Sequence, residues 1–435
     1  MEEKQELIEE NDNFFEQNID ESNNTIQTID HKNIAPVEKE KKPPKIHLDI
    51  LDGFRGLAIL IVMWFHIWQQ SWLGTDFEIF GMKFNFDFIP RTGFMGVELF
   101  FFISGFVLFY PYARSFYEGA KTPNLRRYVY RRFIKIVPTY YLSLLVMVLW
   151  PHNLNITDAK ELGIYVLKHL LFINSLTIDT FYDRINGVLW SLSVEVQFYI
   201  VFPLIVLLMK KFYKIAPLIV FIVTNIFAIM YRNYYISNPK DMSFMFNQLP
   251  GVIDIFVGGM FTCYLIVWAR NKFNFNIIHK IVFAALSLTC LLTYFYMMSQ
   301  YNREAMQIWQ SSNRQYFVYL FMGMMGFGCL SIGVWRKIVA NKVLVFLSLI
   351  SYNLYIWHDY ILLQLLKYRI PPFIGNNQHD DPNFNKVLYT ILAFGISIVV
   401  ATLLTYLFEI PLLKNGFKGI YVKIKSLFLK QIKKV

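Results

Sequence analysis

The amino-acid sequence contains little charge for its length. Only 17% of its 435 residues are charged, against about 25% in soluble domains. By contrast, 55% are hydrophobic and the mean hydropathy is +0.37. A soluble chain of this length would divide into two or three domains, each of which needs a polar surface. The composition therefore excludes a soluble Rossmann enzyme and a coiled coil, and it favours a protein that lies in a membrane.

Cysteine is also scarce. The three cysteines fall inside apolar runs, and none of them forms a CxxC pair; they are Cys263, Cys290 and Cys329. This scarcity excludes a secreted disulfide scaffold, and we expect buried, inert thiols. The sequence shows no cluster of metal ligands and no haem motif, so we predict no metal site.

Two further signals are missing from the sequence. It contains neither a Walker loop nor a GxGxxG loop, which argues against a nucleotide-hydrolysing pump. Its start is acidic and is not followed by a short apolar stretch, so we predict no signal peptide. The net charge of +11 could indicate nucleic-acid binding, but membrane proteins collect lysine and arginine in their cytoplasmic loops. We therefore expect no nucleic-acid partner.

The first 46 residues differ from the rest of the chain. Residues 1–30 hold ten acidic side chains and one lysine, with few apolar groups. Such a segment cannot bury enough apolar surface to offset its ordering entropy. We predict a disordered cytoplasmic tail over residues 1–46, which ends in a basic collar of Lys39, Lys41, Lys42 and Lys45.

Long apolar segments fill most of the remaining chain. Each is long enough, at about 1.5 Å per residue, to cross all or most of a membrane core of about 30 Å. Residues 162–176 are apolar but shorter, and Lys168 and His169 interrupt them, so we interpret them as interfacial or re-entrant. We count ten spans, at about 55–72, 93–112, 134–150, 187–209, 215–235, 249–269, 277–298, 315–335, 343–366 and 386–408.

Lysine and arginine predict the orientation of these spans. If the N-terminus lies inside, the inner segments hold 29 of the 42 basic residues and the outer loops hold 12. This is the bias expected of cytoplasmic loops. We therefore predict an all-α, multi-pass protein of the cell membrane with about ten helices and both termini in the cytoplasm. Its transmembrane domain covers residues 47–410, and a basic cytoplasmic tail covers residues 411–435.

The first span carries two basic residues on one face. Arg55 and His66 are eleven residues apart, so their directions from the helix axis differ by about 20° and they are about 16 Å apart along it. Arg55 lies near the cytoplasmic mouth and His66 in the outer half. Asp52 is close to the same face and could pair with Arg55.

Other spans place ionisable residues near the depth of His66. Charges inside a membrane are costly and commonly mark pathways or reaction sites, so we predict a polar chamber. Glu98 and Glu195 could instead form pairs that serve assembly alone. We interpret Asp254, which is close to glycines that allow a tight helix crossing, and Asp359 as structural when each is taken singly. The residues at this depth are Glu98, Glu195, Asp254, His358 and Asp359.

A basic loop precedes the third span. It could serve as a topology signal that contacts anionic lipid. It could also clamp the phosphates of a soluble cofactor, since guanidinium groups grip phosphate in a bidentate manner. Its cations are Arg126, Arg127, Arg131, Arg132 and Lys135.

Six motifs follow one another along the chain: LDGFRGLAILIVMWFH, GVELFFFISGF, RRFIKIVP, WSLSVEVQFY, SYNLYIWH and FEIP. In the first motif, an arginine is followed after ten residues by a histidine. Taken in this order, the six motifs resemble those of the acyltransferase 3 family of integral membrane acyltransferases, from about residue 47 to about residue 410. In the third motif, Lys135 stands where the family more usually has arginine.

The resemblance implies transfer of an acyl group, commonly acetyl, from cytoplasmic acyl-CoA as co-substrate. The acceptor would be a hydroxyl of a cell-surface polysaccharide or of a related glycan or lipid-linked glycan. Some relatives carry a C-terminal esterase-like SGNH domain. This chain ends 26 residues after Glu409, so we expect direct transfer to the acceptor or transfer through a separate extracytoplasmic transferase partner.

Acyl transfer to an alcohol assigns roles to these residues. His66 is the predicted general base, because imidazole titrates near neutral pH. Glu195 or Glu98 could orient its second ring nitrogen, as a carboxylate does in a catalytic triad. The predicted acyl-CoA contacts are Arg55, Arg131, Arg132 and Lys135, and the predicted acceptor contacts are Trp190, Ser193 and His358.

Two alternatives remain open. Ser193 and Ser104 lie close to the carboxylates, so an acyl-serine intermediate is conceivable, although no nucleophile-elbow motif is present. The chain could also be a secondary transporter of a small anion or a glycan precursor, with the same charges as a proton-coupled site. Against a transporter, the spans show no obvious inverted repeat and the basic loop would have no role.

Overall fold

A computed structural model describes most of the chain. The described residues are 48–151, 156, 158–181, 185–237, 241–301, 305–374, 384–414 and 416. The predicted N-terminal tail and most of the predicted C-terminal tail lie outside these ranges. The chain divides into two units. The unit Ile46–Thr405 contains all the long helices, and of the other unit the structure describes only residues 406–414 and 416.

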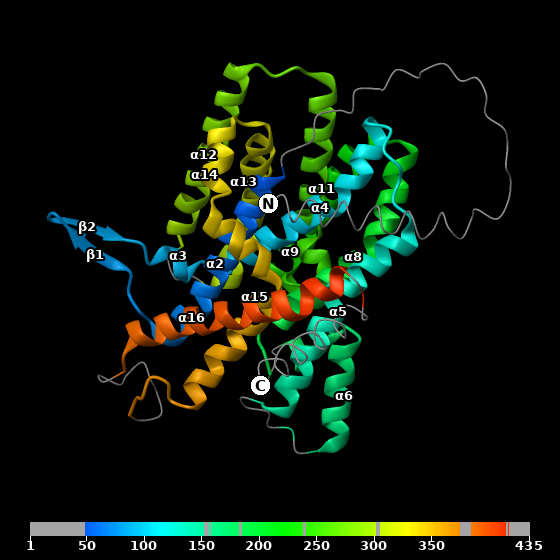
Figure 1. Cartoon of the computed structure of the whole chain (residues 1–435). Helices are drawn as coiled ribbons and strands as arrows, with labels where there is room; N and C mark the ends of the chain where they lie inside the picture. Colours follow the sequence, from blue (N-terminus) through cyan, green and yellow to red (C-terminus); the bar gives the residue numbers. More distant parts are fainter. Residues whose placement is uncertain are drawn as a thin grey trace, which may run out of the picture. The chain divides into compact units, whose positions relative to one another are not determined.

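A long helix occupies each of the ten predicted spans (Figure 1). Their bounds are α2 Asp49–Ser71, α4 Met95–Tyr117, α5 Leu125–Leu149, α8 Leu189–Lys211, α9 Ala216–Ser237, α11 Leu249–Lys272, α12 Ile277–Ser299, α13 Met306–Leu330, α15 Lys342–Lys367 and α16 Lys386–Leu404. A π-helical turn, Thr405–Glu409, follows α16. The fold class is therefore all-α and multi-pass, as the apolar segments predict.

Within the described ranges, eight helices are long and apolar enough to cross a membrane. The number becomes nine if α15 and the short helix α14 (Gly333–Val339), which meet at 53°, form one bent span. Helix α13 is not among them. Its first half reads MQIWQSSNRQ, and these polar residues lower its mean hydropathy. Two of them, Gln310 and Arg314, pair with Glu98 of α4.

The predicted interfacial segment forms a short helix. Helix α6, Ala159–Leu170, has 12 residues and is about 18 Å long, which is too short to span a membrane. The Asp158 side chain caps its start by accepting from the backbone N–H groups of Lys160 and Glu161. Lys168 Nζ donates to Asp179 Oδ2 at 2.6 Å, and this bond lowers the pKa of Asp179. Asp179 belongs to helix α7, Ile178–Phe181.

A β-hairpin projects from the helices after α2 (Figure 1). Strands β1 (Asp76–Ile79) and β2 (Met82–Asn85) pair antiparallel, and their turn, Phe80 and Gly81, takes positive φ values of 52° and 76°. Such a two-residue turn matches the twist of the strands. The Phe80 side chain at the tip is 96% exposed. Two further short helices are α3, Phe88–Arg91, which follows the hairpin, and α10, Met242–Phe246, which precedes α11.

Glycines let two pairs of helices cross in backbone contact. A Cβ atom added at Gly259 of α11 would lie 2.0 Å from the Phe102 carbonyl oxygen of α4, and one at Gly105 would lie 2.0 Å from the Phe256 oxygen. The tight crossing that the α11 glycines predict is therefore confirmed. A Cβ atom at Gly56 of α2 would lie 2.0 Å from the carbonyl oxygen of Leu344, on α15.

Two hydrophobic clusters fill the interior of the main unit. One gathers side chains of α4, α8, α11 and α13, and the other gathers side chains of α5, α15 and α16. Helix α2 contributes to both, for example Phe54 to the first and Met63 to the second. Helix α2 therefore contributes side chains to both clusters.

Candidate active site

A histidine and an aspartate from two crossing helices form the centre of the candidate site. His66 Nδ1 of α2 lies 3.6 Å from Asp359 Oδ1 of α15. The side chains are 20% and 8% exposed, respectively. The separation suits an ion pair and is slightly long for a hydrogen bond, as catalytic contacts often are before substrate binds. Asp359, which the sequence alone favours as a structural residue, thus contacts the predicted base.

The turn of the chain before α8 fixes the Asp359 carboxylate. The backbone N–H of Gly187 donates to Asp359 Oδ2 at 3.1 Å. One residue earlier, Asn186 Nδ2 donates to the carbonyl oxygen of Ile356 at 2.7 Å. Both contacts join the same turn to the same stretch of α15. The turn therefore holds Oδ2 of Asp359, while Oδ1 faces His66.

A second histidine lies beside the first. The rings of His66 and His358 have centroids 5.0 Å apart, in an edge-on arrangement. His358 is fully buried, and its Nδ1 lies 2.9 Å from the carbonyl oxygen of Leu354. The structure therefore brings together two residues that the sequence predicts for one site, the base and an acceptor contact.

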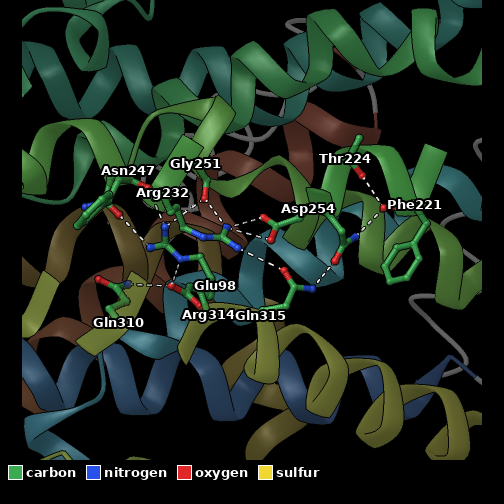
Figure 2. Close-up of polar contacts among 12 residues, drawn as sticks. Glu98, Phe221, Thr224, Arg232, Asn247, Gly251, Asp254, Gln310, Arg314 and Gln315 are labelled. Carbon is green, nitrogen blue, oxygen red and sulfur yellow. Dashed lines mark hydrogen bonds and ion pairs between the residues drawn. The ribbon is translucent and has the colours of Figure 1, made fainter. Parts of the chain in front are cut away.

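Glu98 lies in a different cluster (Figure 2). Its Oε1 accepts from Arg314 Nε at 2.7 Å and from Gln310 Nε2 at 2.9 Å. Glu98 and Arg314 are 2% and 1% exposed. The structure thus places Glu98 in a buried ion pair between α4 and α13, which is the assembly alternative to its orienting role. The assignment of Glu98 as a catalytic residue stays a prediction.

A second buried ion pair adjoins the first (Figure 2). Arg232 Nη1 of α9 lies 2.9 Å from Asp254 Oδ2 of α11. Arg232 and Arg314 both donate to the carbonyl oxygen of Gly251, at 2.9 Å and 3.2 Å. Two cations and two carboxylates make the group formally neutral, so its charges compensate one another in the low-dielectric interior. This arrangement agrees with the structural interpretation of Asp254.

Sequence reasoning missed the two arginines of this cluster. Counting lysine and arginine places Arg232 and Arg314 among the outer-loop charges, whereas both are buried inside helices. The available signal was their position within or beside apolar segments, at the depth that Glu98 and Asp254 share. A buried arginine at that depth needs a carboxylate partner.

Glu195 contacts hydroxyl groups of two helices. Its Oε1 accepts from Ser104 Oγ of α4 at 2.7 Å and from the hydroxyl of Tyr199 at 2.5 Å. Among the described residues, the carboxylate within ion-pair distance of His66 is that of Asp359. It is not the carboxylate of Glu195 or Glu98, the two residues that the sequence predicts for this contact. The Ser104 hydroxyl donates its proton to the Glu195 carboxylate. Glu195 could therefore accept that proton in the acyl-serine alternative.

Three polar residues follow one face of α8. Ser191, Glu195 and Tyr199 are four residues apart, so they lie on one side of the helix over about 12 Å. Ser191 Oγ is 2.6 Å from the hydroxyl of Tyr355, whose ring centroid is 5.8 Å from that of His358. At the other end, the Arg132 guanidinium lies over the Tyr199 ring at 5.7 Å. We call Ser191, Glu195 and Tyr199 the α8 polar face; it connects the histidines with the basic helix α5.

The other two predicted acceptor contacts belong to different surroundings. Trp190 packs edge-on against Phe101 and also contacts Phe181. Ser193 is fully buried, donates to the carbonyl oxygen of Phe172 and accepts from Ser175. Two residues correspond to about 200° around a helix, so Ser193 faces away from Glu195 and the α8 polar face.

Two of the predicted acyl-CoA contacts, Lys135 and Arg55, lie near the first half of α15. Lys135 Nζ of α5 lies 5.4 Å from the ring centroid of Tyr352. Arg55 Nη1 lies 3.7 Å from Asp52 Oδ1, as their spacing predicts, and Ser348 Oγ donates to the same oxygen at 3.0 Å. Positions 348 and 352 are one helical turn apart on α15. Cations of α2 and α5 are therefore brought to one place.

Helix α5 presents the rest of the basic cluster. Its Asn124 cap accepts from the backbone N–H of Arg126 at 2.8 Å, which starts the helix directly at the arginines. Arg131 and Arg132 are partly buried, whereas Arg126 is exposed. Among the described residues, no group of three or more His, Cys, Asp and Glu side chains could hold a metal ion.

These features define a multi-pass membrane protein with a histidine–aspartate pair between its helices. The Acyltransferase domain model of the acyltransferase 3 family matches residues 48–406, which include every residue of the site described above. The chain therefore belongs to the acyltransferase 3 family, as its six motifs indicate.

Named relatives resemble the chain over most of its length. It is 24% identical over 409 residues to "Peptidoglycan O-acetyltransferase OatA" of Listeria monocytogenes, a match that covers 86% of this chain and 57% of the relative. It is 24% identical over 389 residues to a putative O-acetyltransferase of Staphylococcus aureus (strain COL), covering 85% and 58%. The chain thus matches less than two thirds of the length of these relatives. No solved structure matches it.

A third relative matches a shorter part. "Protein 2 in picA locus" of Rhizobium radiobacter is 29% identical over 166 residues, which is 35% of this chain and 75% of that protein.

Proposed function

We propose that this protein transfers an acyl group, acetyl in the simplest case, from cytoplasmic acyl-CoA to a hydroxyl of a cell-surface polysaccharide or a related glycan or lipid-linked glycan. Family membership supports the reaction class, and the O-acetyltransferase names of two relatives support acetyl as the group. The word peptidoglycan in one of those names supports a glycan acceptor.

The α8 polar face is the observation that carries this proposal. It begins beside Arg132 of the basic helix and ends, through Tyr355, beside His358 and His66. With the N-terminus inside, the basic end faces the compartment that contains acyl-CoA. The phosphates of CoA would bind at that end, and the thioester would extend along the face toward the histidines. One site can then hold a cytoplasmic donor and an acceptor from outside.

The His66–Asp359 pair can perform the chemical step. The His66 ring also has a hydrogen bond to the Gln69 side chain. With Nδ1 facing the carboxylate, Nε2 is the nitrogen that would take the proton of the acceptor hydroxyl. The hydroxyl oxygen then forms a bond to the thioester carbonyl carbon, and the carbon–sulfur bond breaks. His66 returns the proton to the departing CoA sulfur, so the base is regenerated. Asp359 stabilises the imidazolium between the two proton transfers.

The basic cluster would act on binding rather than on chemistry. Arg55 is about 16 Å from His66 along α2, too far to touch the reacting atoms. Arg55, Arg131, Arg132 and Lys135 would hold the phosphate end of CoA, where guanidinium and ammonium groups form charge-assisted hydrogen bonds.

A secondary transporter is less well supported. A proton-coupled transporter needs buried carboxylates that can change their charge during the cycle. Glu98 and Asp254 are instead paired with arginines 2.7 Å and 2.9 Å away. The basic cluster also has no role in that alternative.

The test is transfer of label by the purified, full-length protein in proteoliposomes. Radiolabelled acetyl-CoA is supplied on the side of the basic loop, and the label is followed into free acetate and into surface glycan supplied on the other side. We expect acetyl esters on the glycan with the native protein and not with His66→Gln. In cells, mass spectrometry of surface glycans with and without the gene product identifies the acceptor. Accumulation of label inside vesicles without thioester cleavage would instead support a transporter.

A further inference from the structure

His358 has a buried ring nitrogen that the mechanism above does not use. His358 is fully buried, yet its Nε2 has no hydrogen-bond partner among the described residues. Buried polar atoms in native proteins nearly always have partners, and an exception calls for a cause such as a ligand. The neighbouring ring is that of the proposed base, His66, at 5.0 Å.

The hydrogen bond of the other ring nitrogen fixes which role Nε2 can play. Nδ1 lies 2.9 Å from the carbonyl oxygen of Leu354, which can only accept. Nδ1 therefore carries the proton, and in the neutral ring Nε2 is a lone-pair acceptor. The ring stays neutral because a second imidazolium beside a charged His66 would be repelled in a low-dielectric site.

A ligand bound beside these adjoining rings would meet two acceptors. In the proposed mechanism His66 turns Nδ1 to Asp359 and uses Nε2 on the substrate, while His358 turns Nδ1 to its own helix, which leaves its Nε2 as a second acceptor. A simple alcohol has one O–H proton and can satisfy only one of them. The remaining acceptor would stay buried and unpaired, which is unfavourable.

From this geometry, and resting on the proposed function, we propose that His358 selects acceptors with two adjacent hydrogen-bond donors. One is the hydroxyl that is acylated, which donates to His66. The other is an O–H or amide N–H on the neighbouring carbon, which donates to His358 Nε2. The substrate class is then a vicinal diol or a hydroxy-amide, as sugars and acetamido sugars provide. His358 is a specificity-determining residue and takes no proton in the reaction.

Three ring alcohols of nearly equal size test this proposal. Cyclohexanol has one donor, trans-cyclohexane-1,2-diol adds a hydroxyl, and trans-2-acetamidocyclohexanol adds an amide N–H. Each is offered with acetyl-CoA to the full-length protein in proteoliposomes, and kcat/KM is compared per reactive hydroxyl. We expect the native protein to prefer at least one two-donor compound over cyclohexanol by about tenfold or more. Which of the two is preferred distinguishes the hydroxyl from the amide as the second donor.

Variants of His358 show whether this preference comes from its Nε2. His358→Leu removes the acceptor, and we expect the preference to fall to within about threefold of unity. His358→Gln offers an amide oxygen in its place and should keep part of the preference. The ratio between acceptors is the readout, because a purely structural role would lower all three rates together.

The outcomes separate this inference from the proposed function. Equal native kcat/KM for all three alcohols, or an undiminished preference in His358→Leu, overturns the role of His358 and leaves acyl transfer intact. Acetylation of surface glycan without acetylation of either two-donor compound also counts against it. Failure of the native protein to consume acetyl-CoA at all counts against the proposed function instead.

Discussion

His66 and Asp359 belong to the first and ninth of the ten long helices, yet Nδ1 of the one lies 3.6 Å from Oδ1 of the other. The same two helices also come into backbone contact at Gly56 of α2 and Leu344 of α15. The contact between His66 and Asp359 gives the proposed base a carboxylate partner, which is held in turn by the Gly187 backbone. The chemistry of the site therefore depends on how two helices pack.

Removing the Asp359 charge tests the pair. Asp359→Asn keeps the size of the side chain but no longer stabilises the imidazolium, so kcat for acyl transfer should fall by about 10²-fold or more. His66→Gln should lower it at least as much. The measurement is transfer from labelled acetyl-CoA at matched amounts of folded protein. Glu78→Gln, on the exposed hairpin, is the control and should leave the rate unchanged. Native kcat in Asp359→Asn would remove the aspartate from the mechanism.

The basic cluster should affect donor affinity. Arg131→Ala or Arg132→Ala would remove a phosphate contact made equally in the ground and transition states, so the acyl-CoA KM should rise about tenfold with kcat little changed. High acyl-CoA should restore most of the rate. Lys280→Ala, an exposed cation of α12, is the matched control. If the cluster serves only as a lipid contact or topology signal, correctly inserted variants will have a native KM.

Two single-cysteine variants test the orientation. After removal of the native cysteines, Thr122→Cys lies in the predicted cytoplasmic loop, and Phe80→Cys lies at the tip of the predicted outer hairpin. We expect a membrane-impermeant thiol reagent to label position 80 in intact cells and position 122 only after the membrane is opened. Labelling of position 122 from outside would reverse the topology and move the proposed donor site to the wrong compartment.

The buried pair of Glu98 and Arg314 should matter for stability. Removing one partner leaves an uncompensated charge, so Glu98→Gln or Arg314→Met should each lower the free energy of unfolding by about 3–5 kcal/mol. The double variant should regain part of that loss, which thermal unfolding in detergent would measure.

The same double variant separates two roles of Glu98. If Glu98 serves assembly, folded double variant keeps near-native kcat for acyl transfer. A loss of kcat comparable with that of His66→Gln, in protein with restored Tm, would show that Glu98 acts in the reaction as the sequence predicts.

The helix crossing itself can be tested through glycine. In Gly56→Ala the added Cβ would come 2.0 Å from the Leu344 carbonyl oxygen, so α2 and α15 must separate. A displacement of about 1 Å at a catalytic contact can cost up to about 10²-fold in rate. We expect Gly56→Ala to lower kcat by about tenfold or more. Gly163→Ala on α6, where nothing lies within 4 Å of the added atom, is the control. Equal rates for the two variants would show that the crossing does not position the base.

The sequence alone determined the membrane class, the ten long helices and the family. Apolar length fixes a helix in a bilayer because every backbone polar group must be satisfied within the segment. Helical periodicity placed Arg55 beside Asp52 and on the face of His66, since these relations lie within one helix. The same local reasoning identified the glycines of α11 as a tight crossing.

The tertiary structure decided which helices meet. Periodicity gives the face and depth of Glu98, Glu195 and Asp359, but three carboxylates at one depth are equivalent until the packing is known. The packing of α2 against α15 brings Asp359 to His66. Glu98 instead pairs with Arg314, and Glu195 accepts a hydrogen bond from Ser104. A buried arginine such as Arg232 likewise resembles a loop charge until its carboxylate partner on another helix is in place, because the energy that keeps it in the membrane comes from that partner.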